Sequence, residues 1–253
     1  MKIQYASDIH LEFADNWSYL KRNPIIVAGD ILILAGDIGY LNDENYTTHP
    51  FWNWASENYK QVIIALGNHE FYKYYDVSTL KDGFCQEVRH NVHSYYNGVV
   101  HLEDVDIIIS TLWANIRLED AYHTEHCVSD FRRIMYGDEL LTFAEFNKEH
   151  QRCLDFIKRS VSASDAKRKI VVTHHVPSFQ MLSPEFKGSR ANGAFTVELA
   201  DYIEQSGIDY WIYGHSHRNI DVTIGATKCV CNQLGYIFAQ EHTDFIHDKH
   251  IEL

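Results

Sequence analysis

The chain has 253 residues, 45% of them hydrophobic, and a formal net charge of -13 at pH 7. This length and apolar content suffice for a substantial core, so we expect one domain that spans residues 1–253. The negative charge argues against a protein that grips duplex nucleic acid, because such binding needs Lys and Arg to neutralise phosphates. An acidic chain still accepts anionic substrates when bound cations reverse the local field.

No apolar run approaches the roughly 18 residues that a membrane-spanning helix needs, and the first residues show no secretory signal pattern. Five cysteines are an odd number for a disulfide framework, and none of them forms a C-x-x-C pair. Free thiols are typical of the reducing cytoplasm. We therefore expect a cytoplasmic protein with no membrane partner.

Short apolar runs rich in Ile, Val and Tyr recur along the chain and predict buried strands. These runs are 3–6, 31–35, 62–66, 107–110, 170–173 and 210–213. Helical periodicity lies between several of them, at 51–58, 77–88, 140–161 and 197–203. Gly207 is a suitable C-terminal cap for the last helix.

This alternation of strands and helices predicts an α/β fold with largely parallel strands. Residues 99–110 and 221–231 look like hairpins added to that core. The least periodic stretches, 113–138 and 176–195, are candidate lid loops.

Polar clusters follow five of the predicted strands. In chain order they contain Asp8 with His10, Asp37, Asn68 with His69 and Glu70, His174 with His175, and His215 with His217. Binding sites in open α/β sheets form outside the carboxyl ends of the strands, so the five clusters should converge. Glycine directly precedes three of them and lets the backbone turn tightly. Mixed carboxylate and imidazole ligands suit Mn, Fe, Zn or Ni better than calcium.

The ordered blocks D-x-H, G-D, G-N-H-E, H and G-H-x-H resemble those of the calcineurin-like metallophosphoesterase superfamily. The resemblance runs from Asp8 to His217 and implies a four-layered α/β/β/α sandwich. Similarity to a small, uncharacterised microbial branch extends to Leu112-Trp113, Asp130-Phe131-Arg132, 174–178, Asn232 and Gly235-Tyr236. Gln233 departs from the proline that is usual in that branch, a change that bears on a loop and puts no metal ligand in doubt.

The resemblance implies two metal ions, most readily Mn, Fe or Zn, that share the carboxylate of Asp37. It assigns one ion to Asp8, His10, Asp37 and His217, and the other to Asp37, Asn68, His174 and His215. Two cations roughly 3.5 to 4 Å apart can share a hydroxide nucleophile and clamp the phosphoryl oxygens during in-line displacement. His69 would lie beside the substrate as general acid or as a donor to developing charge.

Some neighbouring residues of the same types are expected to have other roles. Asp30 precedes the strand 31–35, whereas Asp37 follows it, so only Asp37 is at the carboxyl end. His175 should point away from His174 on an extended segment and take a packing role or support a ligand. Glu70 is interpreted as a residue that favours a helix start.

The lid regions offer candidates for substrate contacts. Arg132 is the leading one, because a guanidinium group matches the geometry of phosphate. The aromatic run 71–75 is compatible with a stacking surface for a base and equally with core packing. His123 and His126 lie in the irregular region without partners and are interpreted as surface residues.

The predicted function is metal-dependent hydrolysis of small phosphate esters, either phosphodiesters or monoesters, with nucleotides among the candidates. A serine/threonine protein phosphatase ranks lower, because residues 36–41 lack the Asp and Arg of its G-D-x-V-D-R-G block. A non-catalytic scaffold of the same fold would lack ligands or His69, and all are present.

Overall fold

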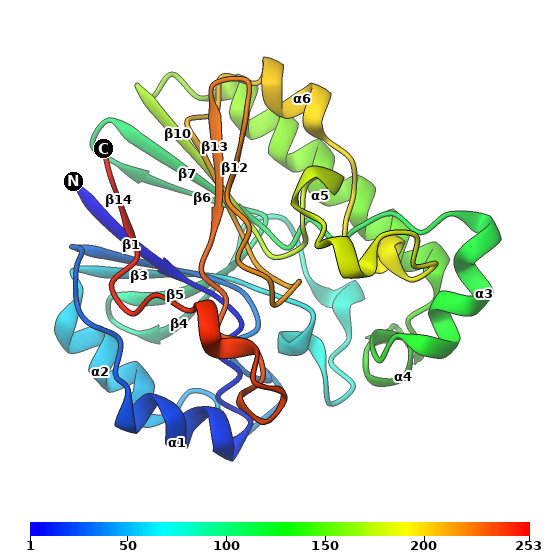
Figure 1. Ribbon diagram of the computed structural model, residues 1–253, viewed down its shortest axis with the longest axis horizontal. Helices are drawn as coiled ribbons and strands as arrows, with labels where there is room; N and C mark the ends of the chain where they lie inside the picture. Colours follow the sequence, from blue (N-terminus) through cyan, green and yellow to red (C-terminus); the bar gives the residue numbers. More distant parts are fainter.

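The computed structural model describes residues 1–253, which form two six-stranded sheets packed face to face (Figure 1). The first sheet has the order β14 (His250–Glu252), β1 (Lys2–Ala6), β2 (Ile31–Ala35), β3 (Gln61–Ala65), β5 (Val92–Tyr96) and β4 (Phe84–Arg89). The second has the order β12 (Val222–Ile224), β13 (Thr227–Cys231), β11 (Tyr210–Tyr213), β10 (Arg168–Thr173), β7 (Val105–Ser110) and β6 (Gly98–Leu102). A small ribbon of β8 (Met135–Tyr136) and β9 (Glu139–Leu140) lies apart.

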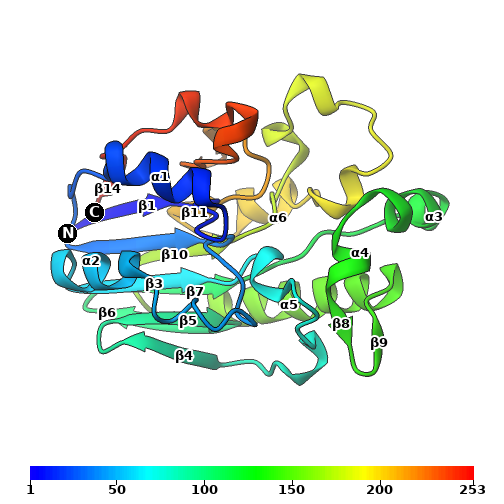
Figure 2. The ribbon, with the colours of Figure 1, turned by 90° about the horizontal axis from the view of Figure 1, so that it is seen from below.

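Helices cover the outer face of each sheet (Figures 1 and 2). α1 (Ala14–Arg22) and α2 (Pro50–Asn58) flank the first sheet, and α5 (Phe143–Ala163) and α6 (Ala200–Gln205) flank the second. α3 (Leu118–Cys127) and α4 (Asp130–Arg133) project beyond the sheets. The predicted four-layered sandwich is therefore confirmed. No helix combines the length and the apolar character needed to cross a membrane.

Strand alternation explains the layers. In β2, Ile31 and Ile33 belong to the apolar layer between the two sheets, whereas Leu32 and Leu34 pack in the layer beneath α1 and α2. Successive side chains of a strand point to opposite faces, and here both faces are covered. A continuous apolar run such as 31–35 is the sequence pattern expected of such a strand.

The main strands run in one direction, which places their carboxyl ends at a common edge. β1, β2, β3 and β5 are successive parallel neighbours in one sheet, as are β7, β10, β11 and β13 in the other. Both chain termini lie at the opposite edge, where the Met1 amino group donates a hydrogen bond to the Leu253 carbonyl at 3.3 Å (Figure 1).

All six predicted strands are present, and both predicted hairpins form, as β6–β7 and β12–β13. The predicted helix at 77–88 is wrong. Residues Val77–Thr79 form a single 3-10 turn, the chain reverses near Gly83 (φ +83°), and β4 follows with alternating burial. The 113–138 region is also more regular than expected, since it contains α3 and α4.

Candidate metal centre

The five polar clusters meet at the carboxyl edge of the two sheets. In the first group, His217 Nε2 lies 3.3 Å from Asp8 Oδ1 and 3.1 Å from His10 Nε2. These three residues follow β1 and β11, which belong to different sheets. Their ligand atoms lie within 4.8 Å of one another, close enough to hold one metal ion.

The second group centres on His174. Its Nε2 atom lies 3.2 Å from Asp37 Oδ1, 3.1 Å from His215 Nδ1 and 3.0 Å from Asn68 Oδ1. Asp37, His174 and His215 again bring their ligand atoms within 4.8 Å of one another. This group therefore offers a second place for a cation.

Asp37 lies between the two groups. While its Oδ1 faces His174, its Oδ2 lies 3.9 Å from His10 Nε2 and 3.9 Å from His69 Nε2. The carboxylate is only 2% exposed, so water contributes little to stabilising its charge. Each carboxylate oxygen is thus directed at a different group of imidazoles.

Five of the converging residues adopt a left-handed backbone. They are Asp8 (φ 54°), His10 (φ 51°), Asp37 (φ 57°), His215 (φ 76°) and His217 (φ 51°). This conformation costs a residue with a side chain about 1–3 kcal/mol and persists only where surrounding structure imposes it. Such strain gathered in one place is characteristic of a functional site.

The three glycines that precede the clusters mainly allow close approach. A Cβ on Gly36 would overlap His174 Nδ1, and one on Gly67 would overlap Asp37 Oδ1. A Cβ on Gly214 would lie 2.8 Å from Asp8 Oδ2. Only Gly36 also has a positive φ, so the expectation of tight turns explains one glycine of the three.

Carbonyl and carboxylate oxygens orient the outer nitrogens of three histidines. Glu12 Oε1 lies 3.0 Å from His10 Nδ1, Glu241 Oε2 lies 2.6 Å from His217 Nδ1, and the Ala35 carbonyl lies 2.9 Å from His174 Nδ1. A proton on each Nδ1 leaves the Nε2 lone pair free to face the shared space. This arrangement suits metal ligation.

Asn68 is held by a buried carboxylate from α4. Its Nδ2 donates to Asp130 Oδ1 at 2.9 Å, and the Tyr72 hydroxyl donates to the same oxygen at 2.7 Å. The Asn68 carbonyl oxygen is thereby turned towards His174. The lid segment around Asp130 thus helps to orient the site itself.

Glu70 ties two of the loops together, and its interpretation as a helix-start residue is incomplete. The buried carboxylate accepts backbone N–H groups from Gly67 at 2.6 Å, Asp37 at 2.9 Å, Ile38 at 2.7 Å and Gly39 at 3.2 Å. Burial and the charge of Asp37 raise the pKa of Glu70, while the backbone donors oppose that rise. Its position fixes the loop of Asp37 relative to that of Asn68.

The buried charges of the site shift several pKa values. Burial alone would lower the pKa of His217, but Asp8 and Glu241 raise it to about 10. Burial likewise disfavours charged His174, yet Asp37 raises its pKa to about 9. Burial would raise the pKa of Glu12, but His10 and His69 lower it to about 2. The buried carboxylates thus require positive charge beside them, and bound cations would supply it.

His69 lies against both groups. Its Nδ1 is 2.9 Å from Glu12 Oε1, its Nε2 is 3.2 Å from the Tyr236 hydroxyl, and its ring stacks on Tyr72 with centroids 4.2 Å apart. The backbone of Asn68 has helical dihedral angles, and a 3-10 helix begins at His69, so the two adjacent side chains point in different directions. With His10 and Asp37, His69 also forms a third group of close potential ligands.

The structure does not bring Arg132 to the ligands. Its side chain is exposed and donates to the His126 carbonyl at 2.7 Å. The neighbouring Arg133 instead lies over the Tyr72 ring, with its guanidinium carbon 5.2 Å from the ring centroid. In the four-residue helix α4, consecutive side chains point in different directions, which the sequence pattern alone did not resolve.

The remaining neighbours lie as follows. Asp30 forms an exposed ion pair with Lys60 at 2.9 Å, before β2 and away from the site. His175 is buried, with Nδ1 3.2 Å from the Thr111 carbonyl and its ring tilted against Trp113. Of the aromatic run, Phe71 is in the core, Tyr74 is 64% exposed, and only Tyr72 lies beside His69.

Gln233 does more than alter a loop. Its Oε1 accepts the backbone N–H of His217 at 2.6 Å, and its Nε2 donates to the Arg218 carbonyl at 2.9 Å. Proline offers neither group. Glu12 and Glu241 are further residues missing from the sequence prediction, although Glu12 lies only two positions after His10.

Comparison with known proteins agrees with this geometry. The family model for calcineurin-like phosphoesterases matches residues 1–219. An uncharacterized protein of Acanthamoeba polyphaga mimivirus is 30% identical over 264 residues, covering 92% of this chain and 91% of that protein. The crystal structure of phosphopantetheinyl hydrolase from Mycobacterium tuberculosis shares the fold, with a TM-score of 0.72, 13% identity, and coverage of 99% of this chain and 95% of that one. The chain therefore belongs to the calcineurin-like phosphoesterase family and is a phosphoester hydrolase.

Proposed function

We propose that this protein hydrolyses small phosphodiesters or nucleotides with two metal ions bound at the carboxyl edge of its sheets. Asp8, His10, Asp37 and His217 would hold one ion, and Asp37, Asn68, His174 and His215 the other. Manganese, iron and zinc suit this mixture of imidazole, carboxylate and amide ligands.

The observation that carries the proposal is the position of Asp37. One of its oxygens lies 3.2 Å from His174 Nε2 and the other 3.9 Å from His10 Nε2, so a single buried carboxylate faces both ligand groups. A shared ligand of this kind is what a pair of closely spaced cations requires. In two-metal enzymes, such a pair activates water and stabilises both the attacking and the leaving oxygen.

The residues around the pair have distinct tasks in the proposed reaction. The oxygen of water bonds to phosphorus and water loses a proton to the solvent, while the ester P–O bond breaks and the leaving oxygen takes up a proton. His69 would supply that proton from Nε2, with Glu12 fixing its Nδ1 at 2.9 Å. Tyr236, whose hydroxyl lies 3.2 Å from His69 Nε2, would help to keep that nitrogen directed at the substrate.

The substrate preference for small esters rests on the surroundings of the site. The hollow over the ligands has a volume of about 400 Å³ and is bordered by Tyr72, Phe186 and Phe195 from separate segments. The loop after Asp37 continues with Ile38-Gly39-Tyr40, without the arginine that a protein phosphatase would present there. The two alternatives are a serine/threonine phosphatase and a phosphomonoesterase. A comparison of substrates distinguishes them from the proposed function.

The test compares Asp37→Ala with Asp30→Ala. Asp37→Ala should abolish turnover of bis(p-nitrophenyl) phosphate and lower the bound metal below two ions per chain, as measured by elemental analysis after reconstitution with Mn²⁺. Asp30→Ala, which removes an equal charge from the opposite edge, should keep both. Two ions in the Asp37 variant, or their loss only in the Asp30 variant, would refute the assignment.

A second measurement concerns the substrate class. The kcat/KM of the reconstituted protein is compared for a phosphodiester, a phosphomonoester and a phosphopeptide, and it should be higher for the phosphodiester than for the phosphopeptide. A phosphopeptide with the highest value would favour the protein phosphatase instead.

A further inference from the structure

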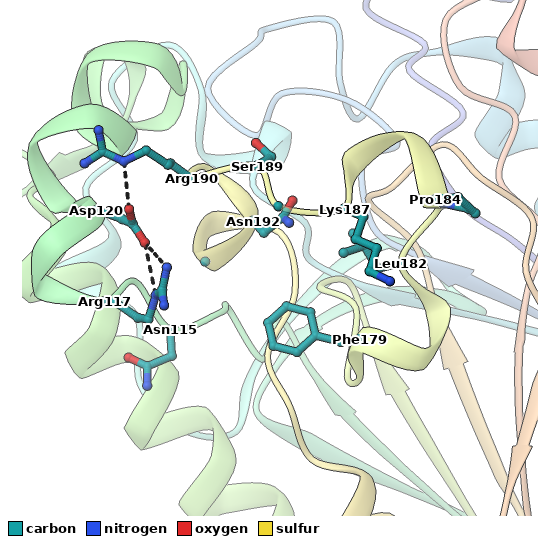
Figure 3. A pocket seen from close by; sticks show the side chains of 12 residues that line it. Asn115, Arg117, Asp120, Phe179, Leu182, Pro184, Lys187, Ser189, Arg190 and Asn192 are labelled. Atoms are coloured by element: carbon teal, nitrogen blue, oxygen red, sulfur yellow. Dashed lines mark hydrogen bonds and ion pairs between the residues drawn. The ribbon is translucent and has the colours of Figure 1, made fainter.

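We call the hollow over the proposed ligands, which Tyr72, Phe186 and Phe195 border, the metal-side hollow. A larger cavity lies beyond it, between the start of α3 and the segment 179–193. Its volume is about 600 Å³, within the range of small-molecule sites. Figure 3 shows Arg190, Asp120 and Arg117 along one wall and Lys187 with Leu182 along the opposite one. We call this space the outer cavity.

An intermediate cavity of about 230 Å³ adjoins both spaces. It shares Leu182, Ser189 and Asn192 with the outer cavity. It shares Phe186, Phe195 and Ser216 with the metal-side hollow. The three spaces therefore follow one another, from the proposed metal ligands to the outer cavity.

The outer cavity is basic in a chain whose formal net charge is -13. Arg117, Lys187 and Arg190 line it, and Asp120 is the only carboxylate among its lining residues. Asp120 accepts from Arg117 Nε at 3.0 Å and from Arg190 Nε at 2.9 Å, which holds both guanidinium groups in place (Figure 3). Arg117 Nη1 also lies 3.3 Å from Glu119 Oε1, outside the lining, so Lys187 is the cation of the lining that no carboxylate neutralises, and it suits an anion.

The position of Lys187 favours an anion-binding site over a purely structural network of ion pairs. Arg190 joins its segment to α3, since it also donates from Nη2 to the Glu119 carbonyl at 2.8 Å. Lys187 is exposed, lines the cavity opposite the arginines, and takes no part in the Asp120 ion pairs. The ion pairs of Arg117 and Arg190 with Asp120 stabilise the position of this segment against α3. Lys187 makes no such contact, so its position in the lining is not accounted for by the stability of the segment.

The intermediate cavity has a different chemistry. Leu182, Phe186 and Phe195 line it, and the Phe195 ring stacks on His215 with centroids 4.7 Å apart. An apolar or planar group fits between such side chains. A molecule that spans the three spaces would thus meet, in order, metal ligands, apolar side chains and cations.

Building on the proposed function, we propose that the substrate is an extended phosphate ester with a second anionic group at its far end. The reacting phosphoryl group lies at the ligands, and one of its organic groups passes Phe186 and Phe195. The distal phosphate or carboxylate pairs with Lys187 and with Arg190, whose Nη1 is not used by Asp120 or by the Glu119 carbonyl. Water still cleaves one P–O ester bond at the ligands, and the distal group takes no part in the chemistry.

The test uses p-nitrophenyl alkyl phosphodiesters in which the alkyl chain ends either in a methyl group or in a phosphonate. Several chain lengths are compared, and release of p-nitrophenolate is measured with the Mn²⁺-reconstituted protein. At the matching length, the phosphonate should lower KM about tenfold, the effect of one well-placed charge-assisted hydrogen bond. Lys187→Glu should remove this advantage and leave kcat and KM for the methyl-terminated ester unchanged.

Lys81→Glu is the matched control, because Lys81 is an exposed lysine outside all three cavities and the change in net charge is identical. It should keep the phosphonate advantage. The inference fails if no chain length shows the advantage, if Lys187→Glu leaves it intact, or if Lys81→Glu removes it equally. Turnover of bis(p-nitrophenyl) phosphate by the wild type separates that failure from failure of the proposed function itself.

Discussion

The two ligand groups of the site differ in what supports them. In the group of Asp8, His10 and His217, carboxylates back both imidazoles, Glu12 behind His10 and Glu241 behind His217. In the group of His174 and His215, a backbone carbonyl backs one imidazole, and His215 Nε2 has no hydrogen-bond partner.

This difference concerns charge as much as orientation. A carboxylate behind a ligating histidine increases the basicity of the ring and adds negative charge near the cation, whereas a carbonyl mainly fixes the ring. We therefore expect the Asp8 group to bind its cation more tightly, and the His174 group to exchange its cation more readily. Asp37 is common to both, so changes at Asp37 should not discriminate between them.

The largest expected effect comes from Gly67→Ala. This variant should abolish metal binding by both groups, so that no difference in their affinities is left. The added Cβ would overlap Asp37 Oδ1, while the φ of Gly67 itself is compatible with alanine. Both cations should be lost together, with the metal content falling towards zero and turnover with it. A variant that keeps one cation would show that the two groups do not depend equally on Asp37.

The next effect concerns His69, which borders the Asp8 group and is also a potential ligand. As a general acid it should contribute about 10² to 10⁴ in rate, or roughly 2.7 to 5.5 kcal/mol of barrier. His69→Ala should therefore slow alkyl esters by such a factor and nitrophenyl esters far less, because nitrophenolate leaves without a proton. Metal content should stay near that of the wild type.

The same His69→Ala measurement separates three roles. Equal slowing of both esters would assign His69 to stabilising the phosphoryl oxygens. Loss of a cation would make His69 a ligand and would extend the Asp8 group by one residue.

The smallest expected effects come from two variants that should each lower the metal affinity of one group only. Glu241→Gln removes the charge behind His217, and Asp130→Asn removes the charge that holds Asn68. Each should weaken one binding step about 10- to 100-fold, the tighter step for Glu241 and the weaker step for Asp130. Calorimetric titration of the metal-free chain with Mn²⁺ measures both steps, and weakening of the same step by both variants would contradict the comparison.

The regular core was predictable because its signals are local. A run such as 31–35 must be buried on both faces, and the residue after it then lies at the carboxyl edge, as Asp37 does. The region 77–88 was not predictable in this way, because its few apolar residues fit a helical spacing while Gly83 reverses the chain into β4. Periodicity over so short a stretch does not decide between the two structures.

Most residues that support the site contact it across long sequence separations, so the structure was needed to identify them. Glu12 contacts His69 across 57 positions, and Asp130 contacts Asn68 across 62. No spacing rule links carboxylates to histidines or amides at such separations. A carboxylate two residues after the predicted ligand His10 was the one local signal available, and the turn at Leu11 and Glu12 brings that carboxylate back to the His10 ring.

The left-handed backbone of five proposed ligand residues places activity and stability in opposition. At these positions glycine would relieve the strain, yet it would remove the carboxylate or imidazole that the chemistry needs. Variants selected only for resistance to heat, without a demand for turnover, should therefore accumulate glycine at positions such as 8 and 37, where it would also remove a buried negative charge that repels its neighbour. Laboratory evolution of this protein for thermal tolerance would have to select for catalysis in every round.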